Sequence, residues 1–256
     1  MTLNSSLVSQ AVFHPRPELP GRSPRGMLTQ TRCDDAVVCG YLHSNPASDN
    51  LLLFFHGNGE VAADYDGLSS LFTACGVWFW VVDYRGYGRS TGTPSFSQML
   101  RDAEAVMDDV PRLAERVGRQ FTRVLVMGRS LGSASAIHIA SRRTASVDGL
   151  ILDSPFADGL ALIRRLGGPA LSREAIPGFE DNLDKIHRCA LPTLIIHGAE
   201  DQIIPIADAE ALHAACPSPS RHLFRIRGAG HNDLLIIALQ EYCRTLTEFV
   251  ARVSHG

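Results

Sequence analysis

A serine flanked by glycines is the residue of this chain best suited to covalent chemistry. The segment Gly128-Arg-Ser130-Leu-Gly132 follows the apolar run Val124–Met127 and precedes the small-residue segment Ser133–Ile137, so it joins an expected strand to an expected helix. Where a strand turns sharply into a helix, a Cβ on either side of the turn collides with neighbouring backbone, which explains both glycines. The pattern predicts that the Ser130 hydroxyl projects outward as a nucleophile, close to the amides that begin the helix.

A serine hydroxyl needs a base to take its proton and a carboxylate to orient that base. Asp201 follows the expected strand that ends near Ile196, and His231 follows the one that ends near Arg227. Because the carboxyl ends of parallel strands meet at one edge of a sheet, we expect Asp201 and His231 to converge on Ser130 as acid and base.

Other residues compete for these roles. Glu200 directly precedes Asp201, and Asp153 also ends an expected strand, so each is an alternative acid. The remaining histidines are interpreted as structural; His56 is expected to hold a glycine-rich loop and His197 to do the same beside Asp201.

Two backbone N–H groups are needed to stabilise the negative charge that develops on an attacked carbonyl. Leu131, directly after the nucleophile, is expected to supply one. The loop His56-Gly-Asn58-Gly59 follows a buried strand, and we assign the second donor to the amide N–H of Asn58.

The elements that must position these residues alternate along the chain. Strands are expected over 36–42, 51–55, 77–82, 124–128, 149–152, 192–196 and 223–226, and helices over 61–75, 97–117, 206–215 and 233–253. This alternation predicts an α/β protein with a mostly parallel central sheet and helices on both faces, in a single domain over residues 1–256.

Two segments lie outside this alternation. Residues 1–26, rich in proline and glycine, are expected to form an N-terminal lead-in without core periodicity. Residues from about 154 to 190 are expected to form a short cap or lid over the site, with Phe156, Leu160 and Ile163 as candidate pocket residues.

Composition excludes several classes of function. The net charge of −3, with scattered arginines, gives no footprint for nucleic acid. The six cysteines lie far apart, without the spacing of a zinc site, so we expect free thiols. Residues 1–10 do not resemble a signal peptide, and no apolar run approaches the roughly 18 residues of a membrane span. We therefore expect a cytoplasmic protein without a stable membrane anchor.

At the level of families, the chain resembles the serine α/β-hydrolase superfamily, and within it the Bem46-like group that includes the α/β-hydrolase-domain-17 depalmitoylases and their bacterial relatives. The motifs that carry the resemblance are His56-Gly-Asn-Gly59, Asp83-Tyr-Arg-Gly-Tyr-Gly-Arg-Ser90, Gly128-Arg-Ser-Leu-Gly132, Leu194-Ile-Ile-His-Gly-Ala-Glu-Asp201 and Gly228-Ala-Gly-His-Asn-Asp233. The resemblance implies an α/β-hydrolase fold, with Ser130 as nucleophile, His231 as base, and Asp201 as the acid in preference to the two alternatives. It also implies a hydrolase that needs no metal and no organic cofactor.

The chain also departs from this group. The depalmitoylase branch has an N-terminal cysteine cluster that is acylated and binds it to membranes, whereas residues 1–32 contain no cysteine. We therefore expect a bacterial-type serine hydrolase that cleaves small-molecule carboxylic esters or thioesters through an acyl-enzyme. A peptidase or acyltransferase with the same three residues, or a ligand-binding protein on a hydrolase scaffold, are the alternatives.

Overall fold

The centre of the protein is an eight-stranded sheet with the strand order β1-β2-β4-β3-β5-β6-β7-β8. The computed structural model describes residues 2–21, 24–176 and 179–255. The strands are β1 (Met27–Cys33), β2 (Ala36–His43), β3 (Asn50–Phe55), β4 (Trp78–Val82), β5 (Arg123–Arg129), β6 (Gly149–Asp153), β7 (Thr193–Gly198) and β8 (Arg221–Ile226). β2 pairs antiparallel with β1 and β4, and every other neighbouring pair is parallel. The predicted α/β class with a mostly parallel sheet is confirmed.

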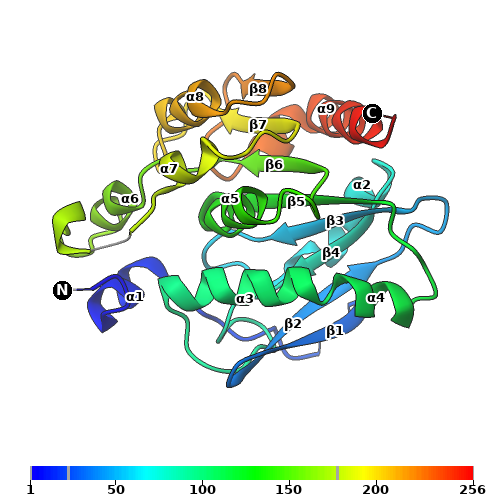
Figure 1. Ribbon diagram of the computed structural model, residues 1–256, viewed down its shortest axis with the longest axis horizontal. Helices are drawn as coiled ribbons and strands as arrows, with labels where there is room; N and C mark the ends of the chain where they lie inside the picture. Colours follow the sequence, from blue (N-terminus) through cyan, green and yellow to red (C-terminus); the bar gives the residue numbers. More distant parts are fainter. Residues whose placement is uncertain (1, 22–23, 177–178, 256) are drawn as a thin grey trace.

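Helices cover both faces of this sheet, which explains why its central strands bury most of their residues. α3 (Phe96–Asp108), α5 (Ser133–Arg142) and α8 (Ile206–Ala215) contact one face, and α3 and α5 cross the near side of the sheet in Figure 1. The 3₁₀ helix η1 (Ala62–Gly67), α2 (Ser69–Thr73) and α9 (Leu234–His255) pack on the other. β4 and β6 are buried along their whole length, as expected of strands covered on both sides.

The helix predicted over residues 97–117 is two helices. α3 ends at Asp108, and α4 (Val110–Arg116) starts again after Asp109 with a proline in its first turn. Pro111 has no N–H to donate and its ring clashes with the preceding turn, so a continuous helix is disfavoured there. The Asp109 carboxylate instead accepts hydrogen bonds from Thr31 and Arg112.

Two N-terminal elements were not predicted. β1 escaped detection because the residues it buries include threonines: Thr29 accepts a hydrogen bond from the Trp80 indole at 2.9 Å. Helix α1 (Ser6–Val12) lies within the segment expected to lack core periodicity. That expectation was wrong for this helix, because Val8 and Val12 are buried in the main core.

Short helices occupy the segment predicted as a cap: α6 (Gly159–Arg165), η3 (Arg173–Ala175) and α7 (Asn182–Ile186). Residues 177–178 of this segment lie outside the described residues. The parallel strands point toward the end of the molecule where α1 and α6 lie (Figure 1), and these two helices contact each other. The loops after β3, β5, β7 and β8 are therefore delivered beneath α1 and α6.

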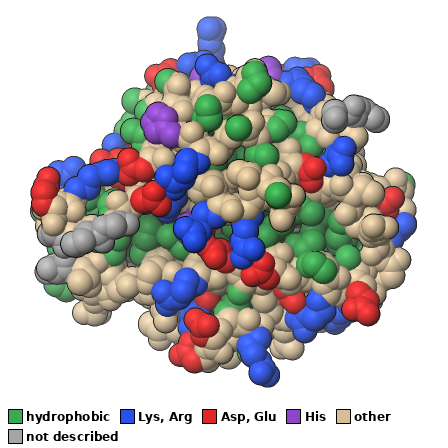
Figure 2. Space-filling model, in the orientation of Figure 1, with side chains coloured by type: hydrophobic (Ala, Val, Ile, Leu, Met, Phe, Trp, Pro, Cys, Tyr) green, Lys and Arg blue, Asp and Glu red, His purple; other side chains and the backbone are tan. Residues whose placement is uncertain are grey.

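The surface has no dominant charge. Acidic and basic side chains are interspersed over the face seen in Figure 2, in keeping with the small net charge. Across the described part of the chain, no helix combines the length and apolar character that crossing a bilayer requires. The same residues contain no cluster of three or more His, Cys, Asp or Glu side chains arranged to hold a metal ion.

Candidate active site

Ser130 lies at the sharp turn between β5 and α5. Its φ of 50° is in the left-handed region, which non-glycine residues rarely adopt and which is enriched at functional sites. A Cβ on Gly128 would collide with the Gly132 carbonyl, and a Cβ on Gly132 would collide with the Phe55 carbonyl. The two glycines allow β5, the turn and the loop after β3 to approach closely with the Ser130 side chain at the apex.

The side chains of Ser130, His231 and Asp201 form one hydrogen-bonded chain. Nε2 of His231 lies 2.9 Å from Oγ of Ser130, and Nδ1 of His231 lies 2.6 Å from Oδ2 of Asp201. A carboxylate only accepts hydrogen bonds, so Nδ1 donates to Asp201 and Nε2 is left to accept from the Ser130 hydroxyl. This is the tautomer that a general base for Ser130 requires.

The environment of Asp201 keeps its carboxylate ionised although the side chain is fully buried. Burial alone raises the pKa of this carboxyl, but hydrogen bonds from His197, His231 and the Ile204 amide outweigh it and hold the pKa below its usual range. Oδ1 accepts from the amides of Ile203 at 2.9 Å and Ile204 at 2.8 Å. Asp201 is therefore fixed as a charged acceptor facing His231.

The two alternative acids lie elsewhere. Asp153 is buried and accepts hydrogen bonds from the Tyr242 hydroxyl at 2.7 Å and from Ser154 at 3.1 Å. Glu200 is exposed. Of the three carboxylates considered, Asp201 is the one hydrogen-bonded to His231.

A cavity of about 190 Å³ opens beside Ser130. Its lining includes Ser130, His231 and both residues expected to supply oxyanion donors, Asn58 and Leu131. Its apolar lining comes from α1, α6 and the loop after β7: Val12, Leu162, Leu166, Ile203 and Ile204. The cavity thus combines a polar end at Ser130 with apolar walls, as small-molecule sites commonly do.

The predicted pocket residues of the lid are not those that line this cavity. Phe156, Leu160 and Ile163 are buried in the core instead. Leu162 of α6 and Leu166, the residue directly after this helix, line the cavity. Residues three or four apart share a face of a helix. The hydrophobicity of α6 therefore predicted an apolar helix but did not show which of its apolar faces lines the cavity beside Ser130.

The loop that carries Asn58 is fixed by contacts that sequence reasoning missed. Oδ1 of Asn58 accepts hydrogen bonds from the backbone N–H of His14 at 2.9 Å and from the Tyr87 hydroxyl at 2.7 Å. On the other side of the loop, the buried His56 ring contacts the Gly57 carbonyl at 2.8 Å, in keeping with the holding role expected of it. The Asn58 side chain is thus occupied in anchoring, which leaves its backbone amide as the group to consider for a ligand.

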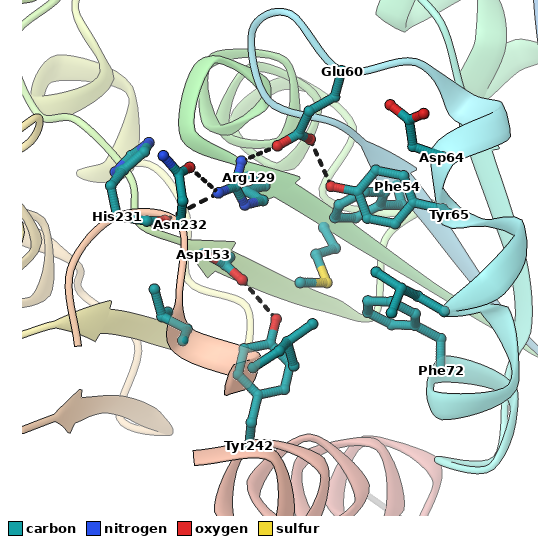
Figure 3. Close-up of a pocket in the computed structure, with 14 residues that line it drawn as sticks. Phe54, Glu60, Asp64, Tyr65, Phe72, Arg129, Asp153, His231, Asn232 and Tyr242 are labelled. Carbon is teal, nitrogen blue, oxygen red and sulfur yellow. Dashed lines mark hydrogen bonds and ion pairs between the residues drawn. The ribbon is translucent and has the colours of Figure 1, made fainter. Parts of the chain in front are cut away.

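Arg129 borders a second cavity, of about 240 Å³, on the α2–α9 side of the sheet. In Figure 3 its guanidinium stands between His231 and Asn232 on one side and Glu60 and Tyr65 on the other. Arg129, His231 and Asn232 also line the cavity beside Ser130, whereas Ser130 is not among the residues of the second one. Arg129 therefore lies between two cavities.

Fold and site together define an α/β hydrolase, and comparison with known proteins agrees. A family model described as serine aminopeptidase, S33, matches residues 46–166. Human α/β hydrolase domain-containing protein 17B is 31% identical over 229 residues, which cover 88% of this chain and 74% of that protein. The mouse protein 17C is 31% identical over 228 residues, which cover 88% and 67% respectively. The chain belongs to the α/β-hydrolase superfamily and resembles its domain-containing-17 proteins.

Solved structures share the fold. The esterase Pf2001 of Pyrococcus furiosus superimposes with a TM-score of 0.76 at 18% identity, covering 93% of this chain and 98% of the esterase. Est1E of Butyrivibrio proteoclasticus, solved with bound ferulic acid, gives a TM-score of 0.72 at 20% identity, covering 89% of this chain and all of Est1E.

Proposed function

We propose that this hydrolase uses Ser130 as its nucleophile and cleaves carboxylic esters or thioesters through an acyl-enzyme. The observation that carries the proposal is the hydrogen-bonded chain from Ser130 through His231 to Asp201, which ends in a cavity. This is the nucleophile, base and orienting acid of acyl transfer.

In the first half-reaction, Ser130 Oγ bonds to the substrate carbonyl carbon while His231 Nε2 takes the hydroxyl proton. The tetrahedral intermediate then collapses, the bond to the alcohol or thiol breaks, and His231 gives its proton to that leaving group. In the second half-reaction His231 Nε2 takes a proton from water as its oxygen attacks the acyl-enzyme carbonyl. The bond between the acyl carbon and Ser130 Oγ then breaks, His231 returns the proton to Oγ, and the acid is released. Throughout, Asp201 orients the imidazole and stabilises its charged form.

The oxyanion is bound by the backbone amides of Leu131 and Asn58 in this proposal. Both residues line the cavity beside Ser130, and Leu131 lies in the turn that begins the helical segment. Loss of one such donor typically costs about 3 kcal/mol of transition-state stabilisation.

The dimensions and lining of the cavity narrow the substrate class. About 190 Å³ is smaller than the range of roughly 300–1,000 Å³ for drug-sized ligands, so we infer a preference for short acyl groups. Among the described residues that line the cavity, none is a carboxylate, and Arg129 contributes positive charge. A free amino terminus of a peptide would lack an anionic partner there, which argues against the peptidase alternative.

The test compares Ser130→Ala with a matched control on the following helix. Ser135 is fully buried, and among the described side chains its hydroxyl is one without a hydrogen-bond partner, so Ser135→Ala should fold and act as wild type. We expect Ser130→Ala to lose both turnover of p-nitrophenyl and coenzyme-A acyl substrates and labelling by a fluorophosphonate. Undiminished labelling of Ser130→Ala would refute the proposed nucleophile.

We also propose that the protein works in the cytoplasm. The six cysteines are all free, and five are buried, which suits a reducing compartment.

A further inference from the structure

Arg129 directly precedes Ser130, and its side chain binds two loops at once. Its guanidinium forms an ion pair with Glu60 in the loop after β3. Its Nη2 donates to the backbone carbonyl of His231 at 3.0 Å and to Oδ1 of Asn232 at 2.8 Å, both in the loop after β8. Figure 3 shows the guanidinium bridging these two sides.

Glu60 extends this bridge to the loop of Asn58. Its Oε2 accepts a hydrogen bond from the backbone N–H of Gly57 at 2.7 Å and one from the Tyr65 hydroxyl at 2.6 Å. Burial raises the pKa of Tyr65 well above its usual value, so this hydroxyl stays protonated and keeps donating. The guanidinium of Arg129 also lies so close to Gly57 that a Cβ at this position would collide with it. An unbroken chain of contacts therefore runs from the residue next to Asn58 to His231.

The bridge is charged and mostly shielded from water. The Arg129 side chain is 15% exposed and that of Glu60 is 25% exposed. Burial alone disfavours the charge on Arg129, but neighbouring groups, with the Glu60 carboxylate foremost, outweigh it and hold the pKa above its usual value. A planar guanidinium presents donors in several fixed directions, whereas an ammonium is a point charge on a flexible stem. Lysine could therefore replace the positive charge of Arg129 but not the fixed arrangement of N–H donors on its guanidinium.

We propose that Arg129 is a positioning residue for the hydrolysis: it fixes the loop that presents the Asn58 amide relative to the loop that carries His231. This inference rests on the proposed function. Its three partners, Glu60, His231 and Asn232, all lie in loops at the site and not in the helices or strands of the core. Misplacement of catalytic groups by about 1 Å can reduce turnover about 10²-fold, so a brace between these loops acts on kcat.

The experiment uses two variants and a matched control. Arg129→Lys removes this arrangement of donors, and Glu60→Gln removes the ion pair while its amide oxygen can still accept from Gly57. The control is Arg85→Lys, because Arg85 is also buried and ion-paired, with Asp102 at 2.6 Å, but contacts none of the site residues. The measurements are kcat, KM, Tm and the second-order rate of fluorophosphonate labelling.

A positioning role predicts that kcat and the labelling rate fall about 10- to 100-fold in both variants, while KM changes by less than about threefold. Arg85→Lys should lower Tm without changing kcat well below Tm. Wild-type kcat and labelling rate in Arg129→Lys and Glu60→Gln, with only Tm reduced, would overturn the inference. Absence of turnover and labelling in wild type would instead refute the proposed function, so the two failures are distinguishable.

Discussion

The buried side chain of Asp201 carries a negative charge that neighbouring hydrogen-bond donors stabilise. Its carboxylate is surrounded by donors from two histidines and two backbone amides, so ionisation is favoured despite full burial. Asparagine keeps the shape but loses the charge, and its amide can hold His231 in the wrong tautomer. We expect Asp201→Asn to lower kcat about 10⁴-fold with Tm still measurable. A loss of less than tenfold in steady-state assays would contradict the assignment of Asp201.

The same carboxylate makes stability depend on pH. Its pKa in the folded protein lies below the unfolded value of about 3.9, so its contribution to stability is fully present above that pH and is lost as pH falls through the folded pKa. Urea unfolding at a series of pH values should therefore show the stability difference between wild type and Asp201→Asn shrinking below about pH 4. A difference that stays constant or grows on acidification would be the contrary result.

The sequence predicts some contacts between individual side chains of the site but not others. The proximity of Ser130, Asp201 and His231 could be predicted because each residue lies in a loop or turn that follows an expected strand. Parallel strands end at one edge of a sheet. The ion pair between Arg129 and Glu60 could not be predicted, because 69 residues separate them and nothing in either local sequence pattern specifies the partner. Long side chains at loop ends have several partners within reach, and only the packed fold selects one.

Among the helices, α6 contributes an apolar side chain to the cavity beside Ser130. Leu160 and Leu162 are both buried, yet only Leu162 lines the cavity. Large-to-small changes at buried leucines cost about 2–5 kcal/mol, so both Leu160→Ala and Leu162→Ala should lower stability. Only Leu162→Ala should also shift the preferred acyl chain toward longer members of a p-nitrophenyl ester series. An equal shift in Leu160→Ala would mean that α6 acts through general loosening.

Elements were predictable where hydrophobic periodicity dominates and hidden where polar residues face inward. The central strands and α8 were found at nearly their observed bounds because their apolar pattern is regular. β1 turns Thr29 and Thr31 into the protein, so its alternation is invisible to a hydrophobicity pattern. The break before α4 follows from Pro111, whose effect could have been anticipated from its missing N–H.

For the whole molecule, the distribution of thiols gives a simple test of packing. Burial raises the pKa of Cys33 and Cys189 to about 12, and it raises the pKa of Cys39 and Cys75 as well. Cys243 is the one partly exposed cysteine. Titration with a thiol-specific disulfide reagent near neutral pH should modify Cys243 first in native protein and all six cysteines after denaturation. Cys243→Ser should abolish the early phase, and two or more rapid thiols would show that the core is more open than described.

The position of His231 has a consequence for synthesis of the chain. His231 lies 101 residues beyond Ser130 and shortly before α9, which covers one face of the sheet and binds Asp153 through Tyr242. When Ser130 leaves the ribosome, His231 has still to be synthesised. Contacts between segments so distant in the sequence form late in folding. In the proposed mechanism, Ser130 therefore gains its base only after His231 has been synthesised and the loop before α9 has packed against the sheet.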